Sequence, residues 1–323
     1  MFSYEIQSNQ FKRKIHQKPT MSKGFTIAGI GELVWDIFST HKRVGGAPAN
    51  FAFHCGALGA EAWPVSCVGT DPLGREMVEE LKRLGVNTRY VYESEVYPTG
   101  TVTVTLRDGK PSYLIGGATA WDHIPFPSSL RQAAEKLDAV CFGSLSQRSG
   151  ESRGTIRSFL RQVPDTALKI FDINLRGSFF SKRLIEESLH CANVLKLSDE
   201  ELPELAKFFT LAGTPAEQLT GLRECFDLNL IAYTRGAEGS LLLSATDMDD
   251  LAGRAVEAVD TVGAGDSYTA ALCMGLLREW PLAEVNRFAS DVSAYVCMQP
   301  GATPNLPEQF RINVSANAAE INK

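Results

Sequence analysis

Asp266 and the three small residues before it, Gly263, Ala264 and Gly265, form the stretch of this sequence best suited to chemistry. An apolar run over residues 270–277 follows them and predicts a helix. The first N–H groups of a helix lack partners and carry partial positive charge, and glycine lets a ligand come close, so this turn predicts an anion hole. There Asp266 could accept a proton from a substrate hydroxyl, or it could merely cap the helix.

Gly45 and Gly46 begin a second cluster of small residues, GGAPANFA, which carries Asn50 at the start of another predicted helix. An asparagine side chain offers both donors and an acceptor, which suits a polyol. Upstream, Asp36 follows a predicted strand and would accept hydrogen bonds from sugar hydroxyls. Each residue also has a structural alternative, because asparagine caps helices and aspartate forms turns.

Short apolar runs alternate with helical segments along most of the chain, which indicates the elements that must position these groups. The predicted strands lie within residues 25–34, 61–69, 138–146, 167–175, 192–198 and 228–236, and a helix is predicted over 75–85. This alternation predicts an α/β fold with a mainly parallel sheet flanked by helices. Ligands of such sheets bind beyond the carboxyl ends of the strands, so the polar residues there are the site candidates.

Residues 99–115 break the alternation. Val102, Val104 and Leu106 alternate there with threonines, and the turn signal Asp108-Gly109 follows, which predicts a hairpin of two antiparallel strands. The hairpin would belong to a small separate sheet that covers the site as a lid, or it would lie at the edge of the main sheet.

The composition excludes several classes of function. The net charge is −6 and no extended Lys/Arg cluster is present, so a nucleic-acid partner is not expected. No apolar run reaches the ~18 residues of a membrane span. Seven cysteines without C-x-x-C spacing predict free thiols in a cytoplasmic protein. The sequence has no P-loop motif, and its five scattered histidines favour neither a zinc site nor a catalytic triad.

Together the two glycine clusters resemble the signatures of the PfkB/ribokinase family of carbohydrate kinases. The first is GGAPANFAFHCGALGAEAWPVSCVGTDPLG and the second is DTVGAGDSYTAALCMGLL, and between them DINLR (172–176), KLSDEE (196–201) and TRGAEGS (234–240) follow in the family's order. The resemblance covers roughly residues 24–310. It implies a ribokinase-like, three-layer fold with a small β lid, and ATP with Mg²⁺ as cofactors.

The resemblance also implies roles for individual residues. Asp266 matches the catalytic base, and Gly263, Ala264 and Gly265 match the anion hole for the transferred phosphoryl group. Arg176 matches a position near both the phosphates and the sugar. Four further residues match the contacts to sugar hydroxyls: Asp36, Gly45, Gly46 and Asn50.

For the nucleotide and the metals the resemblance implies a longer set of residues. Glu201 matches the acid that organises Mg²⁺ through water. Nucleotide positions are matched by Asn174, Ser198, Thr234, Gly236, Gly239, Gly263, Gly265 and Ser290. Ser198 and Ser290 stand where the family often has asparagine, so their contacts depart from its pattern. Asp260, Val262, Gly301 and Asn305 match the place where many members hold K⁺ beside the anion hole.

The segments GELVWD and KLSDEE, with the hairpin, look most like those of fructokinases, which implies phosphorylation of D-fructose to fructose 6-phosphate. Ribose, 2-keto-3-deoxygluconate or a nucleoside remain alternative acceptors, and a catalytically silent sugar- or nucleotide-binding regulator is the alternative from another class. We expect an N-terminal extension over 1–23, a kinase domain over 24–312 with lid strands within about 34–45 and 88–120, and a tail over 313–323. The exposed apolar lid face predicts a homodimer formed through the lid.

Overall fold

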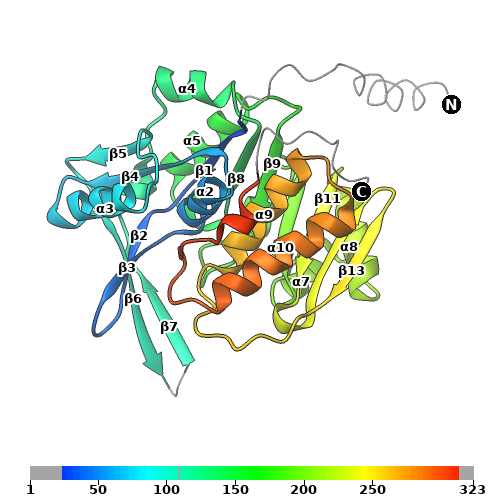
Figure 1. Ribbon diagram of the computed structural model, residues 1–323. Helices are drawn as coiled ribbons and strands as arrows, with labels where there is room; N and C mark the ends of the chain where they lie inside the picture. The colour runs from blue at the N-terminus through cyan, green and yellow to red at the C-terminus, as the bar shows by residue number, and fades with distance from the viewer. Residues whose placement is uncertain (1–23, 108–109, 313–323) are drawn as a thin grey trace. The chain divides into compact units, whose positions relative to one another are not determined.

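A nine-stranded, mainly parallel sheet forms the centre of the part of the chain that the structure describes, residues 24–107 and 110–312 (Figure 1). In this computed structural model the strand order is β13-β12-β11-β10-β9-β8-β1-β4-β5. The strands are β1 Thr26–Ile30, β4 Glu61–Gly69, β5 Val91–Ser94, β8 Ala139–Phe142, β9 Leu168–Asp172, β10 Val194–Ser198, β11 Leu230–Thr234, β12 Gly239–Ser244 and β13 Met248–Ala252. The predicted α/β class and all six predicted strands are confirmed.

Helices cover both faces of this sheet because the buried residues of its strands alternate between two apolar cores. In β1, Ile27 lies in the core that α2, α9 and α10 cover, whereas Ala28 and Ile30 lie in the core that α4 to α8 cover. The arrangement is therefore three-layered (Figure 1). The helices are α2 Ala47–Ala57, α3 Pro72–Arg83, α4 Ser128–Ala134, α5 Gly150–Leu160, α6 Lys182–Leu189, α7 Leu202–Phe209, α8 Pro215–Cys225, α9 Ala264–Leu277 and α10 Leu282–Cys297.

A second, four-stranded sheet has the order β3-β2-β6-β7 and is called the small sheet below. Its strands are β2 Val34–Ile37, β3 Lys42–Gly45, β6 Gly100–Arg107 and β7 Lys110–Ile115. β6 and β7 pair antiparallel, so the predicted hairpin belongs to a separate sheet, and the alternative of an edge hairpin in the main sheet is wrong. The predicted turn residues Asp108 and Gly109 lie outside the described residues.

Two details of the strands differ from the sequence analysis. β5 falls within the range expected for the lid, but it pairs with β4 at the edge of the main sheet. β12 and β13 add an antiparallel hairpin at the opposite edge, which the sequence analysis did not predict. The β5 segment carries no local pattern that distinguishes one sheet from another, so its pairing with the distant β4 decides its place. The β12–β13 hairpin is instead formed by neighbouring segments. No helix within the described residues has the length and hydropathy to cross a lipid bilayer.

The carboxyl ends of three neighbouring parallel strands bring the middle motifs together. β9 ends at Asp172, β10 at Ser198 and β11 at Thr234, and in the register Asp172 lies opposite Lys196 and Ser198 opposite Thr234. The stretches DINLR, KLSDEE and TRGAEGS therefore meet along one edge of the sheet, as the rule for open α/β sheets predicts.

Candidate active site

The two glycine-rich stretches meet at the start of α9. Gly263 is the N-cap residue with a φ of 79°, and a Cβ on it would lie 2.6 Å from the Cα of Ala302, so no other residue type fits. Asp266 lies in the first turn of α9, and its Oδ2 accepts a hydrogen bond of 2.8 Å from Nδ2 of Asn50 on α2. The anion-hole turn, the candidate base and the candidate sugar contact thus share one place.

The first turn of α9 leaves backbone donors for a ligand. The N–H of Ala264 donates a hydrogen bond of 3.3 Å to the carbonyl of Thr261. One of the three amides expected in the anion hole therefore already has an acceptor. No acceptor among the described residues takes the N–H of Gly265. A Cβ on Gly265 would lie 3.1 Å from Nζ of Lys196, which places an ammonium group next to this turn. The turn therefore combines free amides with a positive charge, which is the chemistry that a phosphoryl group requires.

The carboxyl group of Asp266 has a pKa near neutral pH. Burial raises its pKa to about 7, and the nearby Asp172 carboxylate adds to the rise, whereas the Asn50 hydrogen bond, Lys196 and Arg176 act in the opposite direction. A base with a pKa close to the working pH combines a large deprotonated fraction with a strong tendency to take a proton. The capping alternative does not explain this environment, because no side chain caps α9 and Asp266 instead accepts from Asn50.

These shifts predict the pH dependence of catalysis. Because a base works as the carboxylate, kcat/KM is expected to fall about tenfold per pH unit below a pH of about 7, the pKa of Asp266. An Asn50→Leu variant loses the hydrogen bond that lowers this pKa, so its acidic limb should move to higher pH. Steady-state kinetics between pH 5.5 and 9 would check this, with the exposed Asp165→Asn as the control that keeps the limb near its original position. An unmoved limb in Asn50→Leu would contradict the assignment.

The small sheet contributes Asp36, Gly45 and Gly46. A Cβ on Gly45 would lie 2.2 Å from Oδ2 of Asp36, so the glycine leaves room for that carboxylate. Gly46 has a φ of 115°, and a Cβ there would lie 2.3 Å from the carbonyl oxygen of Glu32. Burial raises the pKa of Asp36 to about 6. This group therefore fits an acceptor for a hydroxyl group that is held largely away from water.

The positive charge of Arg176 acts on the pKa of both Asp36 and Asp266. Arg176 is exposed on the loop after β9, and its guanidinium donates to the carbonyl of Leu175 at 3.1 Å and to Oδ1 of Asn174 at 3.3 Å. Its charge acts to lower the pKa of Asp36, Asp266 and the buried Glu32, against a larger opposing effect of burial. Arg176 therefore lies within electrostatic reach of both the sugar-side and the base-side carboxyls.

Asp172 and Lys196 form a buried ion pair that the sequence analysis did not single out. Nζ of Lys196 lies 3.1 Å from Oδ1 of Asp172, and the two side chains are 6% and 4% exposed. Burial alone disfavours the ammonium, but Asp172, Glu201 and Asp266 outweigh it and raise the pKa of Lys196. Thr269 on α9 donates to Oδ2 of Asp172 at 2.8 Å. A lysine inside an otherwise apolar strand was the signal that could have revealed this pair.

Glu201 and Asn174 hold the loop that carries Arg176. Both oxygens of Glu201 accept backbone hydrogen bonds, from the N–H of Leu175 at 2.9 Å and from the N–H of Ser198 at 2.8 Å. Asn174 has a φ of 42°, and its buried Nδ2 has no hydrogen-bond partner among the described residues. An unpaired buried donor at the carboxyl edge of the sheet matches a phosphate oxygen as its partner.

The remaining nucleotide candidates lie further along the same edge. Gly236 has a φ of 53° and begins a short 3₁₀ turn between β11 and β12, and Gly239 follows that turn. The hydroxyl of Thr234 points to the carbonyl of Leu197 at 3.4 Å. Ser290 on α10 lies 3.1 Å from the hydroxyl of Ser240, within a polar network that joins the helix to the sheet. The structure thus gives Ser290 a contact inside the protein. A Cβ on Gly236 would meet nothing within 4 Å, whereas a Cβ on Gly239 would lie 2.0 Å from the carbonyl oxygen of Leu251.

Three of the four candidates for a potassium site, Asp260, Val262 and Gly301, meet beside a guanidinium group. Asp260 accepts hydrogen bonds from the N–H groups of Val262 at 3.1 Å and Gly301 at 3.0 Å, and its Oδ2 forms an ion pair of 2.8 Å with Arg43. The carbonyl of Asn305 accepts a hydrogen bond of 3.2 Å from the hydroxyl of Tyr295. A guanidinium group therefore stands where the resemblance implies a metal cation.

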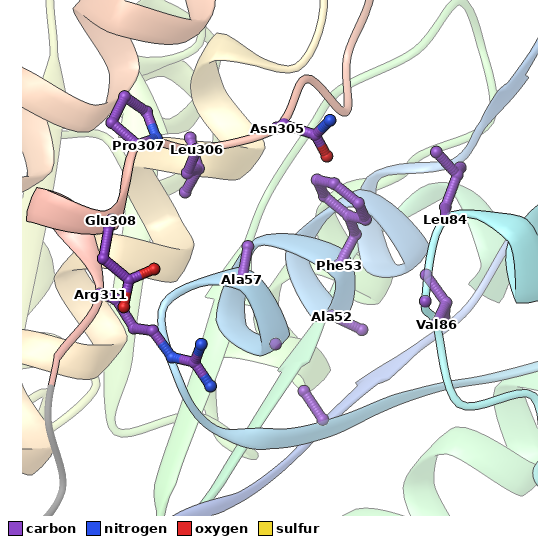
Figure 2. A pocket seen from close by; sticks show the side chains of 13 residues that line it. Ala52, Phe53, Ala57, Leu84, Val86, Asn305, Leu306, Pro307, Glu308 and Arg311 are labelled. Atoms are coloured by element: carbon purple, nitrogen blue, oxygen red, sulfur yellow. The ribbon is translucent and has the colours of Figure 1, made fainter.

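Asn305 also lines a cavity of about 400 Å³ over the outer side of α2, together with Phe53, Leu306 and Arg311 (Figure 2). Figure 2 shows Asn305 and Phe53 pointing toward one another across this cavity. None of Asp36, Asn50 and Asp266 lines it. This cavity is therefore separate from the place where Asn50 and Asp266 meet.

His54 is a structural residue, as its position behind Asn50 predicts. It is fully buried, and its Nε2 donates to the carbonyl of Ala302 at 2.8 Å, since a carbonyl can only accept. Burial lowers the pKa of His54 to about 4, so the ring stays neutral. The contact ties α2 to the segment that packs against Gly263.

Curated sugar kinases are similar to this chain over most of its length. The chain is similar to an uncharacterized sugar kinase, PH1459, of Pyrococcus horikoshii, with 31% identity over 88% of this chain and 94% of that protein. It is also similar to a fructokinase of Salmonella typhimurium, with 30% identity over 83% of this chain and 90% of that protein.

Solved structures have the same fold. The Pyrococcus horikoshii kinase superposes with a TM-score of 0.75 at 30% identity, over 86% of this chain and 93% of that one. A fructokinase of Xylella fastidiosa reaches a TM-score of 0.77 at 22% identity, over 87% and 95% of the two chains, and shows the fold alone. The sequence profile of the pfkB family carbohydrate kinases matches residues 22–309. Since that match covers nearly the whole described chain and both signature stretches meet at Asp266, this protein belongs to the pfkB family of carbohydrate kinases.

Proposed function

We propose that this kinase transfers the γ-phosphoryl group of ATP to D-fructose and forms fructose 6-phosphate. The contact that carries the proposal is the 2.8 Å hydrogen bond between Asn50 and Asp266 beside the free amides of α9. It supports the proposal because it joins the candidate base to the candidate sugar contact at the turn of the candidate anion hole. Fructose as the acceptor is supported by the fructokinase of Salmonella typhimurium, and ATP by the Pyrococcus horikoshii kinase, whose structure is a complex with ATP.

In the reaction we propose, Asp266 takes the proton of the acceptor hydroxyl as its oxygen attacks the γ-phosphorus. A new O–P bond forms, the bond from that phosphorus to the β–γ bridging oxygen breaks, and ADP leaves with the electron pair. The amides at the start of α9 stabilise the negative charge on the transferred group. The positive charges of Lys196, which lies beside Gly265, and of Arg176, which acts on Asp266, add to this stabilisation. Asp36 and Asn50 hold the sugar so that its hydroxyl faces Asp266.

The residues on the nucleotide side fit Mg-ATP. Within the described ranges no cluster of three His, Cys, Asp or Glu side chains could hold a metal ion alone, which suits an ion that arrives on the phosphates. Each oxygen of Glu201 accepts one backbone N–H and keeps a lone pair for a water. Bound Mg²⁺ would neutralise phosphate charge, Glu201 would hold its waters, and the unpaired Nδ2 of Asn174 would donate to a phosphate oxygen.

A coupled ADP-release assay tests the proposal. The panel contains fructose, glucose, ribose, 2-keto-3-deoxygluconate, a nucleoside and fructose 6-phosphate, and the Asp266→Asn variant serves as the blank. We expect the highest kcat/KM with fructose. A higher value with another acceptor would overturn the choice of sugar, and no ADP release above the blank with any acceptor would overturn the kinase activity itself.

We also propose a homodimer formed through the small sheet, with the sheet acting as a lid. Leu114 on β7 is 73% exposed, which leaves apolar surface on this sheet in the single chain. Light scattering after size exclusion is expected to give twice the mass of one chain. A Leu114→Asp variant should shift it toward the single-chain mass, and a wild-type protein that is monomeric would contradict the proposal.

A further inference from the structure

Arg43 brings a fixed positive charge from the small sheet to the loop that precedes the anion hole. Its Nη1 lies 2.8 Å from Oδ2 of Asp260, and that oxygen also accepts the N–H of Gly301 at 3.0 Å. A Cβ on Gly301 would lie 3.4 Å from Nη1 and 3.7 Å from Cζ of Arg43, so the guanidinium rests against the backbone of Gly301. The Arg43 and Asp260 side chains are 39% and 22% exposed.

This ion pair lies directly behind the anion hole. Asp260 precedes Gly263 by three residues. Ala302, which follows Gly301, packs against Gly263 so closely that a Cβ on Gly263 would lie 2.6 Å from the carbonyl oxygen of Ala302. An unpaired Asp260 carboxylate would place a negative charge beside a turn that has to bind a phosphoryl group. Some cation must therefore balance Asp260, and in this structure Arg43 does so.

The site does not fit K⁺ while Arg43 is in place. A guanidinium cannot lose its proton in a protein, so a second cation would meet a fixed like charge and a carboxylate already paired. The expectation of a bound potassium ion, which the resemblance implies, therefore disagrees with the residues of this chain.

The strand that supplies Arg43 also faces the sugar side of the site. In the register of the small sheet Arg43 lies opposite Asp36, and Gly45 on the same strand packs against the carboxylate of Asp36. Because Arg43 is part of β3, its guanidinium is present at a high effective concentration near Asp260 whenever β3 lies against the loop before α9. The ion pair between Arg43 and Asp260 also links the position of the small sheet to the net charge of the loop before α9.

We propose that Arg43 is a built-in substitute for the monovalent cation, so that the anion hole of this kinase is complete without K⁺ once β3 is docked. The proposal rests on the kinase activity at Asp266 but not on the identity of the sugar. It assigns Arg43 as a positioning residue, because the guanidinium acts on the anion hole through Asp260.

The test compares wild type, Arg43→Met and Lys42→Met in KCl, NaCl and choline chloride at equal ionic strength, with whichever sugar is turned over fastest. Lys42 is the matched control, since it lies on the same strand and pairs with the half-exposed Glu76. Wild type and Lys42→Met should vary by less than about twofold among the salts. Arg43→Met should lose at least about tenfold in kcat in choline chloride, the scale of a lost anion-hole group, and recover activity when K⁺ or millimolar guanidinium is added.

A second readout needs no substrate. The melting temperature of Arg43→Met should rise in KCl relative to choline chloride, whereas that of the wild type should not change. A wild type whose turnover or melting temperature depends strongly on K⁺ would overturn the proposal. Undiminished activity of Arg43→Met in choline chloride would do the same, as would a loss that neither K⁺ nor guanidinium relieves. If no sugar were phosphorylated, the kinase proposal would fail and the melting temperatures would still decide the role of Arg43.

Discussion

Replacement of Asp266 by asparagine is expected to lower kcat by about 10²–10⁴-fold, the contribution of a positioned base. Asparagine keeps the shape of the side chain but cannot take the proton of the acceptor hydroxyl. The first turn of α9 and its free amides should remain, so the affinity for ATP should change little. Single-turnover kinetics and calorimetric titration with ATP would separate the lost chemistry from lost binding.

The same variant is expected to be more stable than the wild type at pH 8. Burial raises the pKa of Asp266 from an ordinary 3.8 to about 7, so the folded protein holds this charge at a cost. An amide removes that cost, which a rise of about three pKa units puts at about 4 kcal/mol. The gain in unfolding free energy should be absent near pH 4, grow as the pH rises and be complete above about pH 7.

Asp165→Asn is the matched control. Asp165 is fully exposed and precedes the amino end of β9, whereas the candidate site lies at the carboxyl ends of the strands. Its substitution should change neither kcat nor stability measurably. Near-native turnover of a folded Asp266→Asn protein would refute the role of Asp266. Lost activity together with lost stability would show that the residue is structural.

Lys196→Met is expected to lower the unfolding free energy by about 3–5 kcal/mol, because it leaves the buried Asp172 carboxylate without its partner. It should also impair catalysis through a separate effect. Lys196 acts to lower the pKa of Asp266, so without it the acidic limb of kcat/KM should move to higher pH. Urea unfolding and the pH profile would measure the two effects independently.

The double variant Asp172→Asn/Lys196→Met distinguishes these effects. It removes both buried charges, so most of the lost stability should return, while kcat should stay low because no ammonium lies next to Gly265. The exposed Lys207→Met should behave as wild type. If the double variant regained full activity, the charge of Lys196 would have no part in catalysis. A single variant as stable as wild type would show that Asp172 is not left uncompensated.

Much of the site could be predicted from local sequence because backbone geometry is locally encoded. The glycines around Ala264, ahead of an apolar helix, predicted the anion-hole turn, and α9 begins at Ala264. The alternation of apolar runs predicted the main sheet, and with it the edge where Asp172, Ser198 and Thr234 end their strands. The residue types of Asp266 and Asn50 indicated their chemistry. They did not indicate that Oδ2 of Asp266 and Nδ2 of Asn50 lie 2.8 Å apart, although 216 positions separate the two residues along the chain.

Only the tertiary structure decided which charges meet. Lys196 looked like one polar residue in an apolar strand until its register with Asp172 and its approach to Gly265 were known. The sequence analysis did not single out Arg43, whose side chain reaches Asp260 across 217 positions and takes the place expected for an ion. Propensity and apolar periodicity act over a few residues, whereas electrostatic interactions depend on distances in space that the packing of distant segments sets.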